Sequence, residues 1–475
     1  MKNEEEPLPD SPRGNPSTRW SVADDVETTG SLSRLGRTAA APSEQPSSSL
    51  FPEMMMEAIV DAANMQRAWD QVRGNRGAPG PDGITLTQFP EWLRPQWAAI
   101  RQQLLDGSYE PSPVRRKTID KPDGGQRQLG IPNVLDRLIQ QAIQQVLTPV
   151  FDPGFSDSSH GFRPHRSAHG AAKQVQRTIR RGRRFVVDMD LSKFFDRVQH
   201  DVLMSRVARK VRDKRLLKLI GRYLRAGVMV EGVLQSSPEG TPQGGPLSPL
   251  LANILLDDLD KELERRGLPF VRYADDFLIF TKSRRAAERV FNGVNRHLTT
   301  VLRLVVNLEK SRIVPADGVE FLGFVFRGVT GTIHVSEKNV QKCKRRIREL
   351  TGRSRGISMT QRLGELRRYL QGWAGYFALA KQMRLFENLD QWIRRRLRMC
   401  FWKRWRFVRT RVQNLLVLGV PRRQAFRHAK SRKGPWHMAK TIASGVGMTN
   451  AWLHDQGLVS LKSLWVKRAP LRRTA

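Results

Sequence analysis

Hydrophobic and polar positions follow two periods along this chain, which predict helices in some stretches and strands in others. From about residue 53 the apolar side chains recur every three or four positions, as in an amphipathic helix. Residues 201–227 and 248–267 repeat this spacing, and each stretch ends at a glycine. Residues 184–191 form a short apolar run with aspartates at its end, which predicts a buried strand.

Three more segments complete the expected core. Residues 270–280 are two apolar runs around a short acidic turn, which predicts a β-hairpin. Residues 319–326 indicate another strand, and beyond Glu337 the helical spacing dominates. Strands that alternate with helices, followed by a helical segment, predict an α+β core with a helical appendage.

The N-terminal segment has a different composition. Residues 1–50 are rich in Ser, Pro, Gly and acids and hold one aromatic residue, Trp20, so we predict a disordered tail over 1–52. The N-terminus lacks the apolar stretch of a secretory signal, and no run of about 18 apolar residues predicts a membrane span. Two cysteines, Cys343 and Cys400, are too few for a disulfide framework or a Cys-rich zinc module, so we expect a reducing compartment.

The charge of the chain indicates a polyanionic partner. The 475 residues include 82 Lys and Arg against 45 Asp and Glu, a net charge of +37. Residues 341–475 alone hold 33 basic and 5 acidic residues, so the excess is concentrated there. Because acidic partners are almost absent from this segment, we expect it to bind nucleic-acid phosphates.

Three aspartates lie where predicted strands end. Asp190 follows the strand in 184–191, and Asp275 and Asp276 occupy the hairpin turn in 270–280. Like charges held beside a buried sheet repel one another and are costly to desolvate, and a divalent cation relieves this conflict. Carboxylate oxygens without nearby His or Cys favour magnesium. Two such ions can assist an in-line displacement at a phosphate.

Nine short motifs occur in an order that resembles the reverse transcriptases encoded by group II introns, with the intron maturases as the nearest form. The motifs are NRGAPGPDG (75–83), YEPSPVRR (109–116), RQLGIP (127–132), HGFRPHRSAH (160–169), DMDLSKFFDRVQHD (188–201), EGTPQGGPLSPLLANILLDDLD (239–260), RYADD (272–276), NLEKS (307–311) and FLGF (321–324). One such motif is weak, but nine in the order of the family make coincidence negligible.

The resemblance implies a right-hand polymerase fold. It places fingers and a palm with an antiparallel sheet over 53–335, an α-helical thumb or maturase domain over 336–412, and a small basic DNA-binding region over 413–475. The segment LQGWAGYF (370–377) is similar to the core of the maturase domain. No nuclease motif follows it, which resembles the class C branch without an endonuclease domain.

The resemblance also implies roles for the site residues. Asp190, Asp275 and Asp276 are the expected catalytic residues, and with the backbone carbonyl of Leu191 they are the expected ligands of two Mg²⁺ ions. Phe195 matches the aromatic gate against a ribose 2′-hydroxyl, with ordinary core packing as the alternative. The other expected nucleotide-binding residues are Lys121, Arg127, Gln243 and Lys310. The expected primer grip is Leu322 with Gly323.

The implied partners are group II intron RNA, an RNA template with a DNA primer, target DNA and deoxynucleoside triphosphates, with no membrane. The expected location is a nucleoid-associated ribonucleoprotein in a bacterial cytoplasm. The aromatic residues Trp373 and Phe377 are expected in the core, and the basic residues around them on the RNA-facing side. These RNA-binding candidates are Arg367, Arg368, Lys381, Arg394, Arg395, Arg398 and Arg406.

Three functions remain open from the sequence. The first is an RNA-directed DNA polymerase that also assists splicing and mobility of its own intron. The second is an RNA-binding splicing factor with a vestigial polymerase, against which the intact Asp190, Asp275 and Asp276 argue. The third is a free-standing reverse transcriptase adopted by the host, for example in DNA repair. A group II ribozyme in the DNA that flanks the reading frame would distinguish the first from the third.

Overall fold

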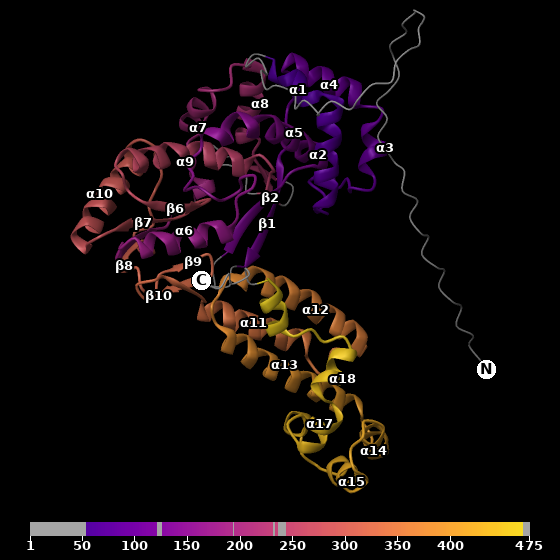
Figure 1. Cartoon of the computed structure of the whole chain (residues 1–475). Helices are drawn as coiled ribbons and strands as arrows, with labels where there is room; N and C mark the ends of the chain where they lie inside the picture. The colour runs from indigo at the N-terminus through magenta and orange to yellow at the C-terminus, as the bar shows by residue number, and fades with distance from the viewer. Residues whose placement is uncertain (1–53, 121–125, 193, 231–232, 236–243, 469–475) are drawn as a thin grey trace, which may run out of the picture. The chain divides into compact units, whose positions relative to one another are not determined.

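The structure is a computed structural model that describes residues 54–468 apart from 121–125, 193, 231–232 and 236–243 (Figure 1). The expected tail over 1–52 therefore lies outside the described residues. The chain forms two compact units, the first from residues up to 153 with 195–254, and the second from 154–194 with 255 onwards. These units divide the chain differently from the expected domains, which stay a prediction.

The first unit is built from helices around a small sheet. Its elements are α1 (Met55–Val60), α2 (Ala62–Gly74), α3 (Phe89–Leu93), α4 (Trp97–Asp106), β1 (Val114–Asp120), β2 (Gln126–Ile131), α5 (Val134–Phe151), α7 (His200–Val207), α8 (Lys214–Arg225), β4 (Val228–Val230), β5 (Val233–Gln235) and the start of α9 (Ser248–Arg265). Helix α5 packs on α1 and α2 and supplies fully buried Leu138, Ile139 and Ile143. The sheet has the order β2-β1-β4-β5, in which β1 is antiparallel to β2 and parallel to β4.

The helical run expected over 201–227 is two helices, α7 and α8, so the prediction of one continuous helix is wrong. The cause is Asp213, whose carboxylate accepts hydrogen bonds from the backbone N–H of Arg215 at 3.0 Å and of Leu216 at 3.4 Å. An aspartate in this position caps the N-terminus of a new helix. Helical spacing continues across the break because each helix has its own buried apolar residues, Val202 and Leu203 in α7 and Leu216 and Leu219 in α8.

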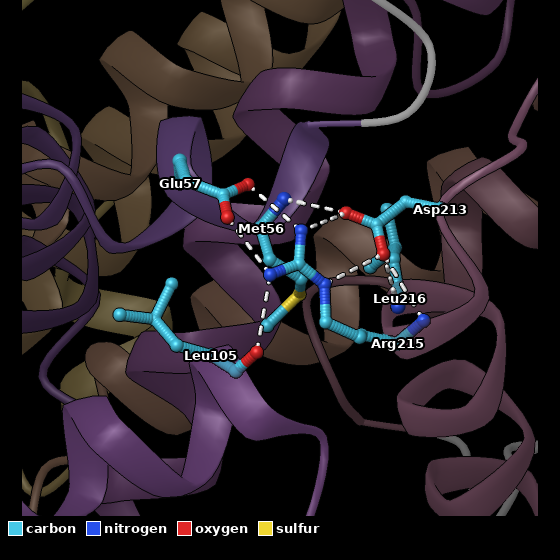
Figure 2. A network of polar contacts seen from close by, with 6 residues as sticks. All are labelled: Met56, Glu57, Leu105, Asp213, Arg215 and Leu216. Atoms are coloured by element: carbon cyan, nitrogen blue, oxygen red, sulfur yellow. Dashed lines mark hydrogen bonds and ion pairs between the residues drawn. The ribbon is translucent and has the colours of Figure 1, made fainter.

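Asp213 also belongs to a polar network that joins α8 to α1 and α4, as Figure 2 shows. Arg215 donates to both carboxylate oxygens of Glu57, at 2.8 and 2.9 Å, and to Asp213 at 3.0 Å. The backbone N–H of Met56 donates to Asp213 at 3.0 Å. Burial raises the pKa of Asp213, but the hydrogen bonds from Arg215 and Met56 outweigh this effect, and the net pKa is lowered.

We expect Asp213→Asn to reduce the free energy of unfolding by about 2 kcal/mol at pH 7, because charge-assisted hydrogen bonds are lost. Since the pKa of Asp213 is lower in the folded state, its stabilisation is present above the unfolded value of about 4 and is lost as the pH falls through the folded value. The difference between wild type and variant should therefore shrink below about pH 4. Urea unfolding followed by circular dichroism measures this, with exposed Asp201→Asn as the control. A difference that is independent of pH would contradict it.

The second unit has two antiparallel sheets and a series of helices. Its elements are the rest of α9, then α6 (Ala168–Arg180), β3 (Phe185–Met189), β6 (Phe270–Tyr273), β7 (Asp276–Thr281), α10 (Arg284–Thr300), β8 (Arg312–Pro315), β9 (Glu320–Phe321), β10 (Phe324–Arg327), β11 (Thr332–Val335), α11 (Glu337–Leu350), α12 (Met359–Tyr376), α13 (Met383–Arg404), α14 (Val408–Val417), α15 (Arg422–Ala429), α16 (Pro435–Met438), α17 (Ile442–Gly447), α18 (Asn450–Asp455) and α19 (Leu461–Arg468). The larger sheet has the order β6-β7-β3-β8, and the smaller has the order β11-β10-β9.

One apolar core runs through this unit. It extends from Val186 and Phe280 of the larger sheet, through Phe324, to Trp373 of α12 and Trp402 of α13. Figure 1 shows α11, α12 and α13 side by side, and α19 packs on both α12 and α13. The described helices include none that is long and apolar enough to cross a membrane.

Most of the elements expected in this unit are confirmed. The hairpin over 270–280 is β6 and β7, the strand in 184–191 is β3, and helix α9 ends just before Gly267, which has φ of 61°. The single strand expected over 319–326 is wrong, because the chain turns back at Leu322 and Gly323. These two residues have φ of 50° and 79°, values typical of a two-residue hairpin turn.

Candidate functional site

The three predicted aspartates come together at one end of the larger sheet. Asp190 directly follows β3, and Asp275 lies in the two-residue turn between β6 and β7. Strands β3 and β7 are antiparallel with Met189 paired to Phe277, so the same register continued by one residue places Asp190 opposite Asp276. All three belong to the second unit.

Negative charge is concentrated at this end of the sheet. Asp276 keeps an exposed surface, yet its pKa is raised to about 7, first by desolvation among the surrounding atoms and then by the charges of Asp188, Asp275 and Asp190. The pKa of Asp188 is also raised, by desolvation and by Asp190, although Arg312 donates to its carboxylate at 3.0 Å. The sequence did not single out Asp188, which shares a face of β3 with Asp190.

Asp190 is held by the segment that follows α10. The side chain of Asn307 donates to the Asp190 carboxylate at 3.2 Å, and the backbone N–H of Asn307 donates to the Asp190 carbonyl at 2.8 Å. The hydroxyl of Ser311 accepts from the Asp190 N–H at 3.0 Å. Leu191 forms an isolated antiparallel bridge with Val306. Asn307 and Ser311 therefore position Asp190, a role that the motif NLEKS alone did not indicate.

A buried ion pair holds the turn that carries Asp275. Arg272 and Asp260 are both fully buried, and the guanidinium donates to both carboxylate oxygens, from Nε at 2.8 Å and from Nη2 at 2.5 Å. The remaining nitrogen Nη1 donates to the carbonyl of Ala274 at 3.0 Å. Since removal of one partner from a buried ion pair costs about 3–5 kcal/mol, this arrangement fixes the turn firmly on α9.

A glycine, Gly161, packs against the other side of the turn between β6 and β7. A Cβ at Gly161 would lie 2.3 Å from the nitrogen of Ala274 and 2.9 Å from the carbonyl carbon of Tyr273. Ala274 itself has φ of 59°, which is uncommon for a residue with a side chain. The backbone of 158–160 runs beside β6 and exchanges hydrogen bonds of 2.8 Å with Arg272 on each side. The turn that carries Asp275 is therefore enclosed by Gly161 and Arg272, neither of which the sequence assigned to the site.

These residues fit a divalent cation by the chemistry of their donors. Carboxylate oxygens are the ligands that Mg²⁺ prefers. The pKa of Asp276 is raised first by desolvation and then by three neighbouring carboxylates, and a cation would favour its charged form. Within the described part of the chain, however, no three His, Cys, Asp or Glu side chains are gathered as a preformed metal site. The ligand set Asp190, Leu191, Asp275 and Asp276 therefore stays a prediction.

The expected nucleotide-binding residues are only partly described. Lys121 and Gln243 lie outside the described residues, and Arg127 is placed by its backbone alone, opposite Ile119 in the β1–β2 pair. Phe195 is half-buried in the 3₁₀ turn Phe194–Asp196. Arg127 and Phe195 belong to the first unit, whereas the exposed Lys310 belongs to the second. Their expected roles stay predictions.

The turn expected to grip the primer is tied to the helices that follow. The hydroxyl of Tyr376 donates to the carbonyl of Leu322 at 2.9 Å, and the N–H of Ser336 donates to the carbonyl of Gly323 at 3.0 Å. A Cβ at Gly323 would lie 2.7 Å from the side-chain nitrogen of Asn339. These contacts hold the turn between β9 and β10 in place, and the close approach of Asn339 leaves no room for a side chain at residue 323.

The seven candidate RNA-binding residues differ in their surroundings: some are exposed to solvent, and others contact the C-terminal helices. Trp373 and Phe377 are buried as expected. Arg395 stacks on Trp436, with its guanidinium carbon 3.8 Å from the ring centre, and Arg398 donates to the carbonyl of Met448 at 2.8 Å. Arg394 is half-buried. The exposed candidates are Arg367, Arg368, Lys381 and Arg406.

Two family models match the chain. The model described as reverse transcriptase (RNA-dependent DNA polymerase) matches residues 119–326, which contain the aspartate site and the hairpin turn at Leu322. The model described as group II intron, maturase-specific domain, matches residues 340–416, which contain most of α11 and all of α12 and α13.

Individual proteins are similar over parts of the chain. Protein YkfC of Escherichia coli is 34% identical over 285 residues, which cover 52% of this chain and 74% of YkfC. The group II intron-encoded protein LtrA of Lactococcus lactis subsp. cremoris is 39% identical over 206 residues, 43% of this chain and 34% of LtrA. The matched region thus spans about a third of LtrA. The solved structure titled partial Cas6-RT-Cas1–Cas2 complex has a TM-score of 0.35 and 27% identity, over 52% of this chain and 42% of that chain.

Proposed function

Because the chain belongs to the family of group II intron reverse transcriptases and maturases, we propose that it copies RNA into DNA and binds a group II intron RNA to assist splicing and mobility. The observation that carries the polymerase function is the cluster of carboxylates formed by the acidic turn between β6 and β7 and by Asp190 at the end of β3. In the terms of this family, the larger sheet is the palm, the first unit supplies the fingers, and α11–α13 form the thumb and maturase domain.

The acidic cluster supports nucleotidyl transfer. Asp190 and Asp275, with Asp276 and the carbonyl of Leu191, would hold two Mg²⁺ ions. When bound, these ions supply the positive charge that favours ionisation of the primer 3′-hydroxyl and stabilises the pyrophosphate leaving group. The protein's own part is to hold the carboxylates in fixed positions, which Asn307 does for Asp190 and Arg272 does for the turn of Asp275.

Further residues select and bind the incoming nucleotide. Lys121 and Arg127 would neutralise the triphosphate, Lys310 would lie near the leaving pyrophosphate, and Gln243 would contact the nucleotide or its template base. Phe195 would pack under the sugar and exclude a 2′-hydroxyl. Leu322 and Gly323 would hold the primer, at the turn that Tyr376 ties to α12.

The maturase region supports binding of intron RNA, and residues 413–475 would contact target DNA. The exposed cations of α12 and the flanking segments provide phosphate contacts, and the buried aromatic residues hold these helices in place. The protein would act as a ribonucleoprotein in the cytoplasm. Extension of a DNA primer on an RNA template with Mg²⁺ tests the polymerase, and a group II intron splicing assay with and without protein tests the maturase. Absence of both activities would exclude the proposal.

We expect Arg367→Gln with Arg368→Gln to weaken intron RNA binding and to flatten the dependence of log K on log salt by about 1.4–1.8, because two phosphate contacts are lost. The comparison is Arg395→Gln with Arg398→Gln, which removes equal charge from residues that join α13 to the C-terminal helices. That pair should lower the melting temperature and change the salt slope less. Filter binding over a salt series and thermal unfolding measure the two effects. Equal salt slopes for both pairs would contradict this division.

A further inference from the structure

A second site for phosphate lies away from the acidic turn, in a cavity of about 520 Å³ in the second unit. Its walls are the loop 157–166, the C-terminal half of α6, and Pro269 with Phe270 at the start of β6. The acidic turn follows the other end of the same four-residue strand. A volume of this size is typical of small-ligand sites in proteins.

The rim of the cavity is positively charged. Arg166, Arg177 and Arg181 line it, together with one acid, Asp157, which pairs with Arg166. Arg177 is exposed on α6, and Arg181 is exposed one helical turn further, so the two side chains lie on the same face. Neither forms an ion pair with a carboxylate among the residues that the structure describes. Two adjacent guanidinium groups repel each other, and an anion bound between them relieves this repulsion.

The floor of the cavity is polar and fixed in orientation. The amide nitrogen of Gln174 donates to the carbonyl of Phe270 at 3.3 Å and to the hydroxyl of Ser158 at 2.8 Å. Its amide oxygen therefore faces Nε2 of His160, at 2.7 Å, and accepts a hydrogen bond from the N–H of that nitrogen. This network holds the loop and α6 together, so the arginines stand around a preformed hollow.

The lining binds phosphate better than it binds a base. Guanidinium groups match phosphate oxygens in pairs, and three of them surround the cavity. The two aromatic rings in the lining offer no open face for stacking, because Phe270 is 2% and His160 is 5% exposed. A free nucleotide would need a place for its base, whereas a strand can leave its bases outside.

We propose that this cavity grips a backbone phosphate of a bound RNA strand, independently of sequence, at a site distinct from the acidic turn. The choice of RNA as the strand rests on the proposed function. The grip itself rests on Arg177 and Arg181 at the rim and on the fixed floor formed by His160 and Gln174.

The test compares Arg177→Gln with Arg181→Gln against a control pair, Lys173→Gln with Arg184→Gln, which removes equal charge from exposed positions outside the cavity. Binding of a short single-stranded RNA is measured by fluorescence anisotropy over a salt series. We expect the cavity pair to bind about tenfold more weakly at low salt and to flatten the log–log salt slope by about 1.4 if both contacts are lost. The control pair should change the slope much less.

A conservative variant separates shape from charge. Arg177→Lys with Arg181→Lys keeps the charge but loses the planar fork, and should fall between wild type and the Gln pair. Melting temperatures of all variants check that the fold is retained. All binding is repeated in Asp275→Asn protein, so that a failure of the polymerase assignment leaves this test unaffected.

Two results would overturn the inference. In the first, the cavity pair and the control pair change the salt slope equally. In the second, the cavity pair loses binding of inorganic pyrophosphate but keeps the wild-type RNA slope, which would make the cavity a site for a free phosphate compound.

Discussion

Asp275→Asn is expected to abolish DNA synthesis on an RNA template while the protein keeps its fold and its affinity for RNA. The substitution preserves the size of the side chain and removes one charge from a site where four carboxylates interact. Removal of this charge weakens the repulsion among the remaining carboxylates, so the free energy of unfolding should not decrease. Primer extension with Mg²⁺ should drop to no more than a few per cent of wild type, because the expected metal ligand is lost.

The matched control is Glu288→Gln, which removes the same charge from an exposed ion pair on α10. It should leave primer extension unchanged, because exposed ion pairs contribute about 0–1 kcal/mol. Splicing assistance by Asp275→Asn should also persist, since the splicing chemistry belongs to the intron RNA. Substantial polymerase activity in Asp275→Asn would remove this residue from the site. Loss of splicing together with polymerisation would show that the two functions are not separable.

The sequence predicted the aspartates of the site because their surroundings are local. Asp190 follows an apolar run, and Asp275 lies between two others, so strand and turn patterns within a few residues identify both. The partners that hold them are distant in sequence. Asn307 meets Asp190 across 117 positions, and Arg272 meets Asp260 from a strand to a helix. Such contacts depend on the register of a sheet and the packing of a helix, which periodicity does not contain.

The errors in the expected elements have equally specific causes. Apolar spacing passed unbroken from α7 into α8, and only the capping carboxylate of Asp213 ends the first run and starts the second. In FLGF the apolar pattern hid a hairpin, because Leu322 adopts a positive φ that its side chain disfavours. The apolar pattern therefore located the strand region correctly and missed the turn within it.

Charge counting reached a similar limit in residues 341–475. It indicates a basic region, but it cannot tell a guanidinium that faces solvent from one that joins two helices. Arg395 and Arg398 contact the C-terminal helices, whereas Arg367 and Arg368 are exposed to solvent. The aromatic residue Trp436, which lies 41 positions after Arg395, decides the role of that arginine.

The contacts around the acidic turn lead to a second large effect, at a residue without any reactive group. Gly161→Ala should reduce the rate of primer extension by about tenfold to a hundredfold, because displacement of a catalytic group by about 1 Å has effects of this size. The new Cβ would lie 2.3 Å from the nitrogen of Ala274, and backbone atoms cannot rotate away from it. The turn between β6 and β7 must therefore shift, and Asp275 shifts with it.

The kinetic signature separates this displacement from loss of a binding contact. Gly161 packs on the turn, so kcat should fall while KM for the deoxynucleotide changes little, whereas a nucleotide-binding residue would raise KM. The matched control is Gly364→Ala in α12, where an added Cβ meets nothing within 4 Å and alanine favours the helix. That variant should keep full activity. If folded Gly161→Ala protein also extends primers at the wild-type rate, the turn tolerates movement, and rigid enclosure by Gly161 and Arg272 is not what positions Asp275.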